Sequence, residues 1–502
     1  MDRLSLLKDL TFGAQIAEDE TSELASYFVQ TDEWTRIFGG KIDIVRGEKG
    51  SGKSALYATL LTKADNLFDQ GIITIAAENL RGATVFKDLV AEPPTTEGEF
   101  IVLWKLYIMT LAAQRMRDLG ISNKHADVAY RALEDSKLLE SGFTLARALR
   151  AVRDLAKRLA SLEAIEGGYE FDPVTGTPKG VTGRIVLAEP TSEEQKRGIL
   201  SIDNVFTSLN EALALAGYRI WVLFDRLDVA FTENHEIEAN ALRALLRAYL
   251  DLRSADNISL KIFLREDIWN RIAHTEQGFR EASHLTKFVV LDWSQESLRN
   301  LLIRRLLSNK ALVSEFDINA EAVLQDANRQ TEVFDRFFPA QVEQGPQKAP
   351  TFKWLLSRCR DGTQKTAPRE LVHLLNSIRT QEIRRLERGE SVAPDGHLFD
   401  RSVFKPALYE VSNARLVQYL YAEYPKQRPL IEKLRGQKTE QTPESLAEHW
   451  SVSDGEARNL ANELADLGFF EIRGTKEDPT YWVPFLYRDA LSLVQGKADA
   501  DD

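Results

Sequence analysis

Cysteine is almost absent from this chain, with Cys359 the only one among 502 residues. One thiol cannot close an internal disulfide, and it cannot supply the set of thiolates that a cysteine-based zinc site needs. The seven histidines are scattered, and no two have the spacing of a metal-binding HExxH helix. We therefore expect no disulfide framework, no cysteine-based zinc site and no HExxH metal site. We also expect the protein to be in a reducing compartment.

Long apolar runs are also missing. No segment reaches the roughly eighteen consecutive apolar residues that a membrane-spanning helix requires, and the most apolar stretch, residues 100–113, is interrupted by Lys105. The first ten residues, MDRLSLLKDL, lack the apolar centre of a signal peptide. The sequence therefore predicts a cytoplasmic protein that does not enter a membrane.

Positive charge is in short supply. The chain has 64 Lys and Arg against 76 Asp and Glu, a net charge of −12. Such a surface repels nucleic acid at long range, which argues against a general DNA-coating protein but leaves room for DNA contact through a local basic patch. The remaining composition, 43% hydrophobic and 28% charged, is that of ordinary globular domains.

The chain is too long for one domain, and its pattern changes near residue 293. Before that point short apolar segments alternate with helical ones, which predicts a parallel sheet covered by helices on both faces. After it, helices predominate. We expect a helical segment, an α/β core with a helical insertion at about 80–200, a helical lid and a C-terminal domain, with bounds 1–40, 41–293, 294–395 and 396–502. Within the insertion, the Gly- and Pro-rich segment 167–197 reads as a loop or small hairpin.

The C-terminal domain has the pattern of a winged helix. Two predicted helices, 442–449 and 453–467, precede a strand–turn–strand segment at 469–483. The second helix has one basic residue, Arg458, and four acidic ones: Asp454, Glu456, Glu463 and Asp466. A helix that enters a DNA groove needs positive charge. We therefore expect this domain to contact protein, while Arg473 and Lys476 in the wing keep DNA contact open as the alternative.

Residues 47–54, GEKGSGKS, match the pattern G-x-x-x-x-G-K-[ST] between a predicted strand and a predicted helix. Glycines let such a bend curl so that its N–H groups point at phosphate oxygens, and the helix start adds positive potential. Lys53 would reach the β- and γ-phosphates, and the Ser54 hydroxyl would bind Mg²⁺. The sequence thus predicts an ATP·Mg²⁺ site, although it does not separate ATP from other triphosphates. Its predicted residues are Gly47, Gly50, Ser51, Gly52, Lys53 and Ser54.

Asp225 directly follows the apolar segment RIWVLF. A carboxylate at the end of a buried strand beside the glycine-rich bend is suited to hold Mg²⁺, directly or through water. Asp228 is the candidate for polarising an attacking water. The alternatives are a simple strand-end cap for Asp225 and, for Asp228, a position too far from the water. In the latter case hydrolysis would be slow and the protein would behave as a switch.

Four segments together resemble a prokaryotic P-loop ATPase family related to the origin-recognition-like and STAND branches of the AAA+ ATPases. They are FGAQIAEDETSELASYFVQT, IVRGEKGSGKSAL, WVLFDRLD and KIFLREDIW. The resemblance covers about residues 10–390 and the C-terminal domain. It implies a five-stranded AAA+ core, a helical lid and a winged helix that gates the nucleotide. The insertion departs from the family by separating Lys53 from Asp225 more than a minimal core requires, and we interpret it as a partner- or target-recognition element.

The resemblance also assigns arginines. Arg265 ends the segment SLKIFLR, where these families place a sensor of the γ-phosphate, and Arg369 opens a lid helix, where a second sensor arginine lies. The alternative for each is an ion pair with a neighbouring acidic side chain. Arg271 and Arg280 occupy the region that would supply an arginine finger to an adjacent subunit, and the sequence does not choose between them.

Three functions remain open at this stage. The first is a regulatory ATPase that gates a protein effector or co-encoded subunit and forms a homo-oligomer, since relatives of this kind often occur in bacterial antiphage-defence operons. The second is a DNA-binding AAA+ ATPase that acts like a loader. The third is a nucleotide-binding scaffold with negligible turnover.

Overall fold

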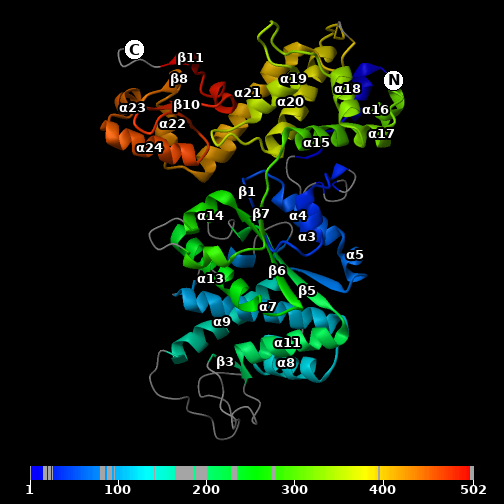
Figure 1. Cartoon of the computed structure of the whole chain (residues 1–502), viewed down its shortest axis with the longest axis vertical. Helices are drawn as coiled ribbons and strands as arrows, with labels where there is room; N and C mark the ends of the chain where they lie inside the picture. Colours follow the sequence, from blue (N-terminus) through cyan, green and yellow to red (C-terminus); the bar gives the residue numbers. More distant parts are fainter. Residues whose placement is uncertain are drawn as a thin grey trace. The chain divides into compact units, whose positions relative to one another are not determined.

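The computed structural model divides into two compact units. The sheet unit comprises Asp32–Gly47 and Lys53–Leu291, and the helical unit comprises Met1–Thr31, Glu48–Gly52 and Asp292–Asp502 (Figure 1). The structure describes residues 2–14, 20, 24, 27–79, 85–87, 93–94, 96–140, 142–163, 185–187, 200–227, 234–273, 279–393 and 396–497. Most of the predicted loop 167–197 therefore lies outside the described residues.

The sheet unit is built on a five-stranded sheet in the order β2-β5-β6-β1-β7, in which every pairing is parallel. Its strands are β1 (Ile44–Gly47), β2 (Ile72–Ala76), β5 (Arg219–Phe224), β6 (Ile258–Arg265) and β7 (Phe288–Val290). β5 and β6 are the apolar segments RIWVLF and SLKIFLR named from the sequence, and the five strands form the predicted parallel sheet. Because the strands are parallel, their carboxyl ends lie along one edge.

One face of this sheet packs on α7 (Glu97–Asp118) and α13 (His235–Leu252). Alternate residues of β5, Ile220, Val222 and Phe224, contribute to that core, as expected when successive side chains of a strand point to opposite faces. The Phe224 ring also meets a tryptophan of α7 edge-on. In Figure 1 the helices α7, α9 and α11 lie together beneath the strands.

The opposite face packs on α4 (Lys53–Thr62), the helix that follows the glycine-rich bend. Tyr57 of α4 meets Phe263 of β6 edge-on, with ring centroids 5.7 Å apart. The sheet is thus covered on both faces, as predicted.

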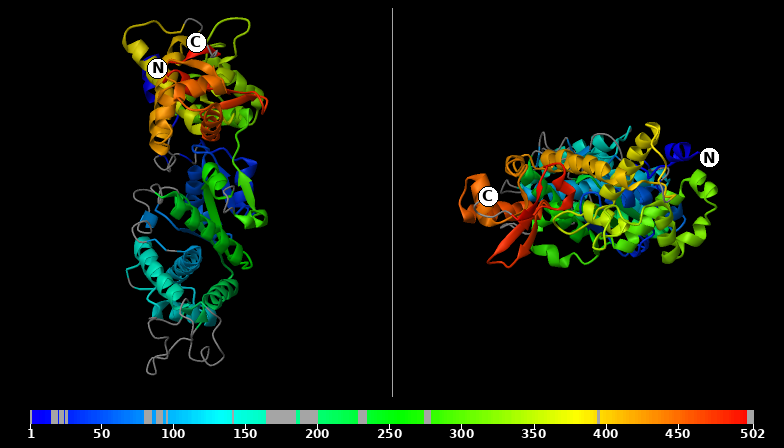
Figure 2. Two further views of the ribbon diagram at one scale, coloured as in Figure 1. Left: turned by 90° about the vertical axis from the view of Figure 1, so that its left-hand side faces the viewer. Right: turned by 90° about the horizontal axis from the view of Figure 1, so that it is seen from above.

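The predicted insertion contributes directly to the core. It contains α7, α8 (Lys124–Asp135) and α9 (Leu145–Glu163), and α11 (Ile202–Ala216) follows it. Trp104 of α7 donates its indole N–H to the carbonyl of Ala241 at 2.8 Å, and Tyr107 donates its hydroxyl to the carbonyl of Ala77 at 2.8 Å. These buried contacts make α7 a layer of the sheet unit, so the recognition role proposed for the insertion does not apply to this helix. Figure 2 shows the cyan helices of this region beside one another.

The first part of the helical unit, where the structure describes it, is mainly helical. Its helices are α1 (Arg3–Asp9), α15 (Gln295–Leu307), α16 (Lys310–Glu315), α17 (Ala320–Leu324), α18 (Ala327–Phe337), α19 (Thr351–Cys359) and α20 (Pro368–Glu387). The beginning of the chain belongs to this unit: Arg379 of α20 donates to the carbonyl of Leu7 at 2.7 Å, and Arg305 forms a buried ion pair with Glu20 at 2.7 Å.

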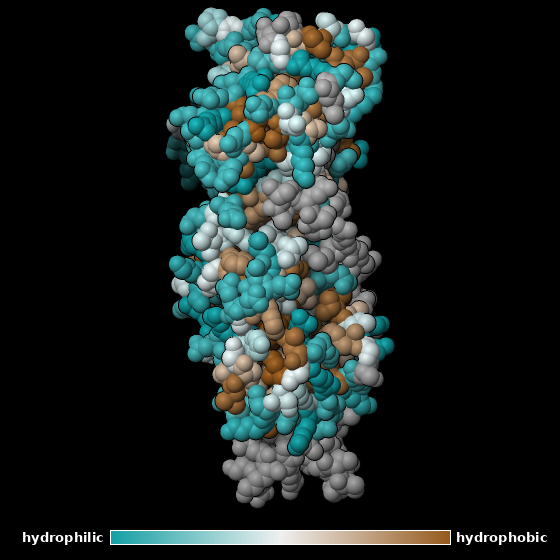
Figure 3. Space-filling view, turned by 90° about the vertical axis from the view of Figure 1, so that its right-hand side faces the viewer, coloured by the Kyte–Doolittle hydropathy of each residue, from teal (hydrophilic) through white to brown (hydrophobic). Residues whose placement is uncertain are grey.

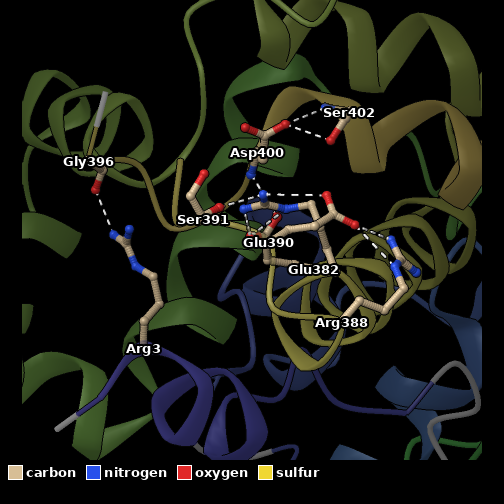
Figure 4. A network of polar contacts seen from close by, with 9 residues as sticks. Arg3, Glu382, Arg388, Glu390, Ser391, Gly396, Asp400 and Ser402 are labelled. Atoms are coloured by element: carbon tan, nitrogen blue, oxygen red, sulfur yellow. Dashed lines mark hydrogen bonds and ion pairs between the residues drawn. The ribbon is translucent and has the colours of Figure 1, made fainter. Parts of the chain in front are cut away.

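A buried carboxylate fastens the end of α20 to the segment that follows it (Figure 4). Glu382 is fully buried, accepts from the guanidinium of Arg385 at 2.6 Å and accepts from the backbone N–H of Asp400 at 2.8 Å. Arg385 in turn donates to the carbonyl of Ser391 at 2.6 Å. These bonds fix the path of the chain from α20 into the C-terminal elements.

The C-terminal elements follow the predicted order of two helices and a hairpin. After α21 (Phe404–Ala414) and the π-helix η5 (Arg415–Tyr421), the chain forms the helices α23 (Pro443–Trp450) and α24 (Asp454–Asp466). A mixed sheet in the order β11-β8-β10-β9 completes this part, and the β9–β10 hairpin projects from it in red (Figure 2). Its strands are β8 (Lys438–Gln441), β9 (Glu471–Gly474), β10 (Pro479–Trp482) and β11 (Val494–Lys497).

One face of the described surface is largely hydrophilic. On the face drawn in Figure 3, hydrophilic side chains predominate and apolar ones lie in small separate groups. Among the described residues, none of the helices has the length and apolar character needed to cross a membrane.

Candidate functional site

The glycine-rich segment forms a tight bend between β1 and α4. β1 ends at Gly47 and α4 begins at Lys53. Gly50 and Gly52 have φ angles of +85° and +101°, in the left-handed region that residues other than glycine rarely adopt. The predicted strand, bend and helix are therefore present in that order, and the glycines occupy positions that require them.

Lys53 turns back over this bend. Its side chain is 8% exposed, and its Nζ donates to the carbonyl of Gly47 at 2.8 Å. A buried ammonium group is thereby held at the mouth of a bend whose N–H groups start a helix. This combination is suited to bind a polyphosphate, because the cation and the helix start both favour negative charge.

Asp225 lies at the same edge of the sheet. Its neighbour Phe224 pairs with Ile262 on β6, while Gly47 pairs with Arg265 on the other side of β6. Asp225 and the start of the bend are therefore two strands apart, on the order of 10 Å at ordinary strand spacing. The Asp225 carboxylate is 5% exposed, which is unusual for an acid and fits a site that holds a cation.

The hydroxyl of Tyr57, on the helix after the bend, donates to the backbone carbonyl of Glu78 at 3.4 Å. Tyr57 lies one helical turn beyond Lys53 on α4. Burial raises the pKa of Tyr57 far above its ordinary value, and the charges of Asp225 and Glu78 raise it further. Both carboxylates therefore act on one hydroxyl of the bend's own helix.

Glu78 is a residue that sequence reasoning missed. It follows β2, the strand next to β5, and is 1% exposed. Its carboxylate accepts from the backbone N–H of Asn79 at 2.6 Å and from that of Val85 at 3.1 Å. The signal was the one used for Asp225, an acid directly after an apolar strand. The sheet order places these two acids on neighbouring strands.

The arginine predicted to sense the γ-phosphate is engaged locally. Arg265 ends β6 beside Gly47, and its guanidinium binds both carboxylate oxygens of Asp267, at 3.0 and 2.7 Å. Its place at the edge suits the predicted role, while the ion pair is the alternative weighed from the sequence. The sensor role therefore stays a prediction.

The other predicted groups of this edge are less defined. Asp228 lies outside the described residues. Arg271 pairs with the buried Glu238, and Arg280 is exposed at the start of a 3-10 turn, so the arrangement still does not choose a finger.

The tip of the bend, Glu48–Gly52, is held within the helical unit. Lys365 donates to the Glu48 carboxylate at 3.2 Å, and Lys49 forms an ion pair with Glu423. Neither Lys365 nor Glu423 has a local signal in the sequence, because each lies hundreds of positions from the bend.

The same tip is packed by two further residues of the helical unit. The indole N–H of Trp293 donates to the carbonyl of Ser51 at 2.8 Å. A Cβ placed on Gly50 would lie 2.9 Å from the Cβ of Arg369, near the start of α20. The side chain of the predicted second sensor arginine therefore begins next to Gly50, and its sensing role remains a prediction.

The residues present fit a nucleotide with Mg²⁺. The hydroxyl of Ser51 is buried and has no hydrogen-bond partner, as expected of a donor that faces a ligand. Ser54 lies in the first turn of α4 and Asp225 at the strand edge, which provides oxygen ligands of the kind that Mg²⁺ takes alongside phosphates. Among the described residues, no group of three or more His, Cys, Asp or Glu is placed to hold a metal ion.

No protein-family model matches the chain, and no curated protein matches it. Among solved structures, the chain is similar to the Walker-type ATPase of Pyrococcus abyssi, with 12% identity, a TM-score of 0.37 and coverage of 92% of this chain and 95% of that one. It is also similar to the ORC2 protein of Aeropyrum pernix in its ADP form, with 10% identity, a TM-score of 0.29 and coverage of 95% and 91%. Similarity at this level does not decide between functions. The choice between them rests on the residues described above.

Proposed function

We propose that this chain is a regulatory P-loop ATPase that binds ATP·Mg²⁺ at residues 47–54 and uses nucleotide state to control a protein partner. The observation that carries the proposal is the bend itself. Left-handed Gly50 and Gly52 lie between a parallel strand and a helix, with Lys53 over the bend and Asp225 on the same sheet edge.

Each residue of the bend has a defined task in this proposal. The backbone N–H groups bind phosphate oxygens, and Lys53 exchanges its bond to the Gly47 carbonyl for the β- and γ-phosphates. Ser54 and Asp225 hold Mg²⁺, which neutralises phosphate charge when bound. Because Arg265 is paired with Asp267, we expect turnover to be slow unless that pair opens.

A protein partner is favoured over DNA by the charges of the C-terminal elements. Glu456 and Glu463 are exposed on α24, the helix that would enter a groove. Arg473 on the hairpin is paired with Glu471 and lies over the ring of Trp482 at 3.6 Å, so its charge is used internally. We propose an effector or co-encoded subunit as the partner, homo-oligomeric assembly, and a role in antiphage defence.

Calorimetric titration with ATP and Mg²⁺ tests the nucleotide site. We expect Lys53→Ala to weaken binding at least about tenfold, because charge-assisted hydrogen bonds contribute about 1.5–3 kcal/mol. Lys41→Ala removes the same charge from an exposed position before β1 and serves as the matched control. If Lys53→Ala binds and hydrolyses ATP as the unchanged protein does, the nucleotide site is wrong.

Co-purification with the products of neighbouring genes, with and without ATP, tests the regulatory part. We expect capture of a partner to depend on nucleotide in the unchanged protein and to lose that dependence in Lys53→Ala. Equal capture under all four conditions would contradict control by nucleotide while leaving ATP binding intact.

A further inference from the structure

Glu78 and Asp225 lie at equivalent points of two neighbouring strands. The last register pair between β2 and β5 joins Ala76 to Leu223, and each acid lies two residues beyond its member of that pair. The ladder continues past the pair, because the N–H of Ala77 donates to the carbonyl of Leu223 at 2.9 Å. The backbones of the two acids are therefore about 5 Å apart, the spacing of adjacent strands.

Both acids belong to the face of the sheet that α4 covers. Ala77 and Phe224 face the opposite way, into the core that packs on α7. Successive side chains of a strand alternate between the two faces, so Glu78 and Asp225 emerge on the other side. That side carries α4, which begins at Lys53. The second acid thus lies on the same face as the helix of the glycine-rich bend.

The two acids are buried beside one hydroxyl of α4. Glu78 is 1% exposed and Asp225 is 5% exposed. The hydroxyl of Tyr57 donates to the carbonyl of Glu78 at 3.4 Å, and the charges of both acids add to the effect of burial in raising the pKa of Tyr57. Like charges at adjacent buried positions are unfavourable, and arrangements of this kind are typical of functional sites.

The residue after Asp225 reaches toward the end of β2. Arg226 has a φ of +57°, in the left-handed region, and its guanidinium donates to the carbonyl of Asn79 at 3.3 Å. Its positive charge lowers the pKa of Tyr57, against the effect of the two acids. Arg226 therefore joins the ends of the two strands and partly offsets the negative charge of the pair.

Backbone N–H groups orient the Glu78 carboxylate. The N–H of Asn79 donates to one oxygen at 2.6 Å, and the N–H of Val85 lies 3.1 and 3.2 Å from the two oxygens. A base that takes a proton from one water has to be held in a fixed orientation. Glu78 meets this requirement at the edge of the sheet where Asp225 lies.

We propose that Glu78 is the general base of ATP hydrolysis at this site. With Mg²⁺ held by Asp225, the Glu78 carboxylate beside it accepts a proton from the attacking water. The water oxygen bonds to the γ-phosphorus while the bond from that phosphorus to the bridging oxygen breaks, and ADP leaves with the electron pair. Glu78 then gives its proton to the released phosphate. The inference rests on the proposed function, and it gives Glu78 the task that the sequence suggested for Asp228.

Glu78→Gln tests this role, because glutamine keeps an oxygen that accepts N–H bonds but does not take up a proton. We expect kcat to fall at least about a hundredfold, the lower end of what a general base contributes. The affinity for a non-hydrolysable ATP analogue, and the dependence of that affinity on Mg²⁺, should stay unchanged. Glu134→Gln, the same change at an exposed glutamate of α8, should alter neither turnover nor binding.

The pH dependence of turnover gives a second measurement. Turnover of the unchanged protein should fall on acidification as the base becomes protonated, and the residual turnover of Glu78→Gln should not. Thermal unfolding checks that the variant is folded. If it is not, Glu78→Asp decides, because it keeps a carboxylate one methylene further back and should retain the pH dependence at a lower kcat.

Three results would overturn the assignment of Glu78. They are full turnover in Glu78→Gln, a loss of Mg²⁺ dependence in that variant, and an unchanged protein that binds the analogue without hydrolysing ATP. The second result would make Glu78 a metal ligand instead of a base. If the unchanged protein does not bind the analogue at all, the proposed function fails, so the two failures are distinguishable.

Discussion

Two constraints require glycine at position 50: the left-handed backbone of the bend and the close packing of α20. Its φ of +85° costs a side-chain-bearing residue about 1–2 kcal/mol. An added Cβ would also lie 2.9 Å from that of Arg369, closer than such atoms approach. We expect Gly50→Ala to lower the free energy of unfolding by about 2 kcal/mol or more and to abolish nucleotide binding.

Gly120 offers the matched control for that prediction. It has a φ of +69°, and a Cβ there would meet nothing within 4 Å. Gly120→Ala should therefore cost only the conformational part, about 1–2 kcal/mol, and leave nucleotide affinity unchanged. Chemical denaturation and calorimetric titration of both variants make the comparison. Normal ATP binding by Gly50→Ala would contradict the assignment of the bend.

A second prediction at the residue scale concerns Asp225 and Mg²⁺. Because its carboxylate would hold Mg²⁺, Asp225→Asn should remove most of the Mg²⁺ dependence of ATP binding and most of the turnover, while affinity measured in a chelator stays the same. Asp256→Asn, an exposed change before β6, controls for lost charge. Binding by Asp225→Asn that still strengthens with Mg²⁺ as in the unchanged protein would assign the metal to another group.

Part of the site could be predicted from single residues and part could not. The glycines, Lys53 and Asp225 are recognisable because the chemistry needs those residue types beside a strand or helix end. Glu78 carried the same signal as Asp225 and was missed, since nothing in the sequence says that β2 and β5 are neighbours. Lys365 and Glu423 leave no local pattern, because an ion pair across the fold depends on packing alone.

At the scale of elements, the sequence was most informative where burial is strongest. The short apolar segments before residue 293 became parallel strands, since a strand buried on both faces must be apolar throughout. In the C-terminal elements, the predicted starts at 442 and 453 are the caps Thr442 and Ser453, which accept from backbone N–H groups of the first turn. The position of α7 could not be predicted, because helical periodicity shows that a face is buried but not what covers it.

The helix α20 supports a prediction about pH. Burial lowers the pKa of His373 below its ordinary value, and the nearby Glu370 and Glu410 only partly oppose this. A depressed pKa in the folded state means that stability is present above the ordinary histidine pKa and is lost as pH falls through the folded one. We expect the helical unit to lose stability between pH 7 and pH 5.

The variant His373→Gln isolates that contribution, since glutamine takes up no proton in this range. Thermal unfolding of both proteins across the pH range should show a smaller loss of Tm on acidification in the variant. Identical Tm–pH slopes would show that other groups cause the acid sensitivity of the helical unit.

At the scale of the whole molecule, charge decides between a protein and a nucleic-acid partner. The net charge of −12 and the exposed acids of α24 both oppose a DNA backbone. We therefore expect no shift of duplex DNA in a gel assay at about 150 mM salt, a concentration that screens charges beyond about 8 Å.

If the negative charge of α24 prevents DNA binding, reversing that charge should produce DNA binding that the unchanged protein lacks. Glu456→Lys with Glu463→Lys changes the helix by four charges and should produce weak, sequence-independent binding that fades with a steep salt dependence. Arg473→Ala with Lys476→Ala tests the opposite case on the hairpin. A shift by the unchanged protein that this second variant loses would show that the hairpin reads DNA, and would favour the loader over a protein-gating ATPase.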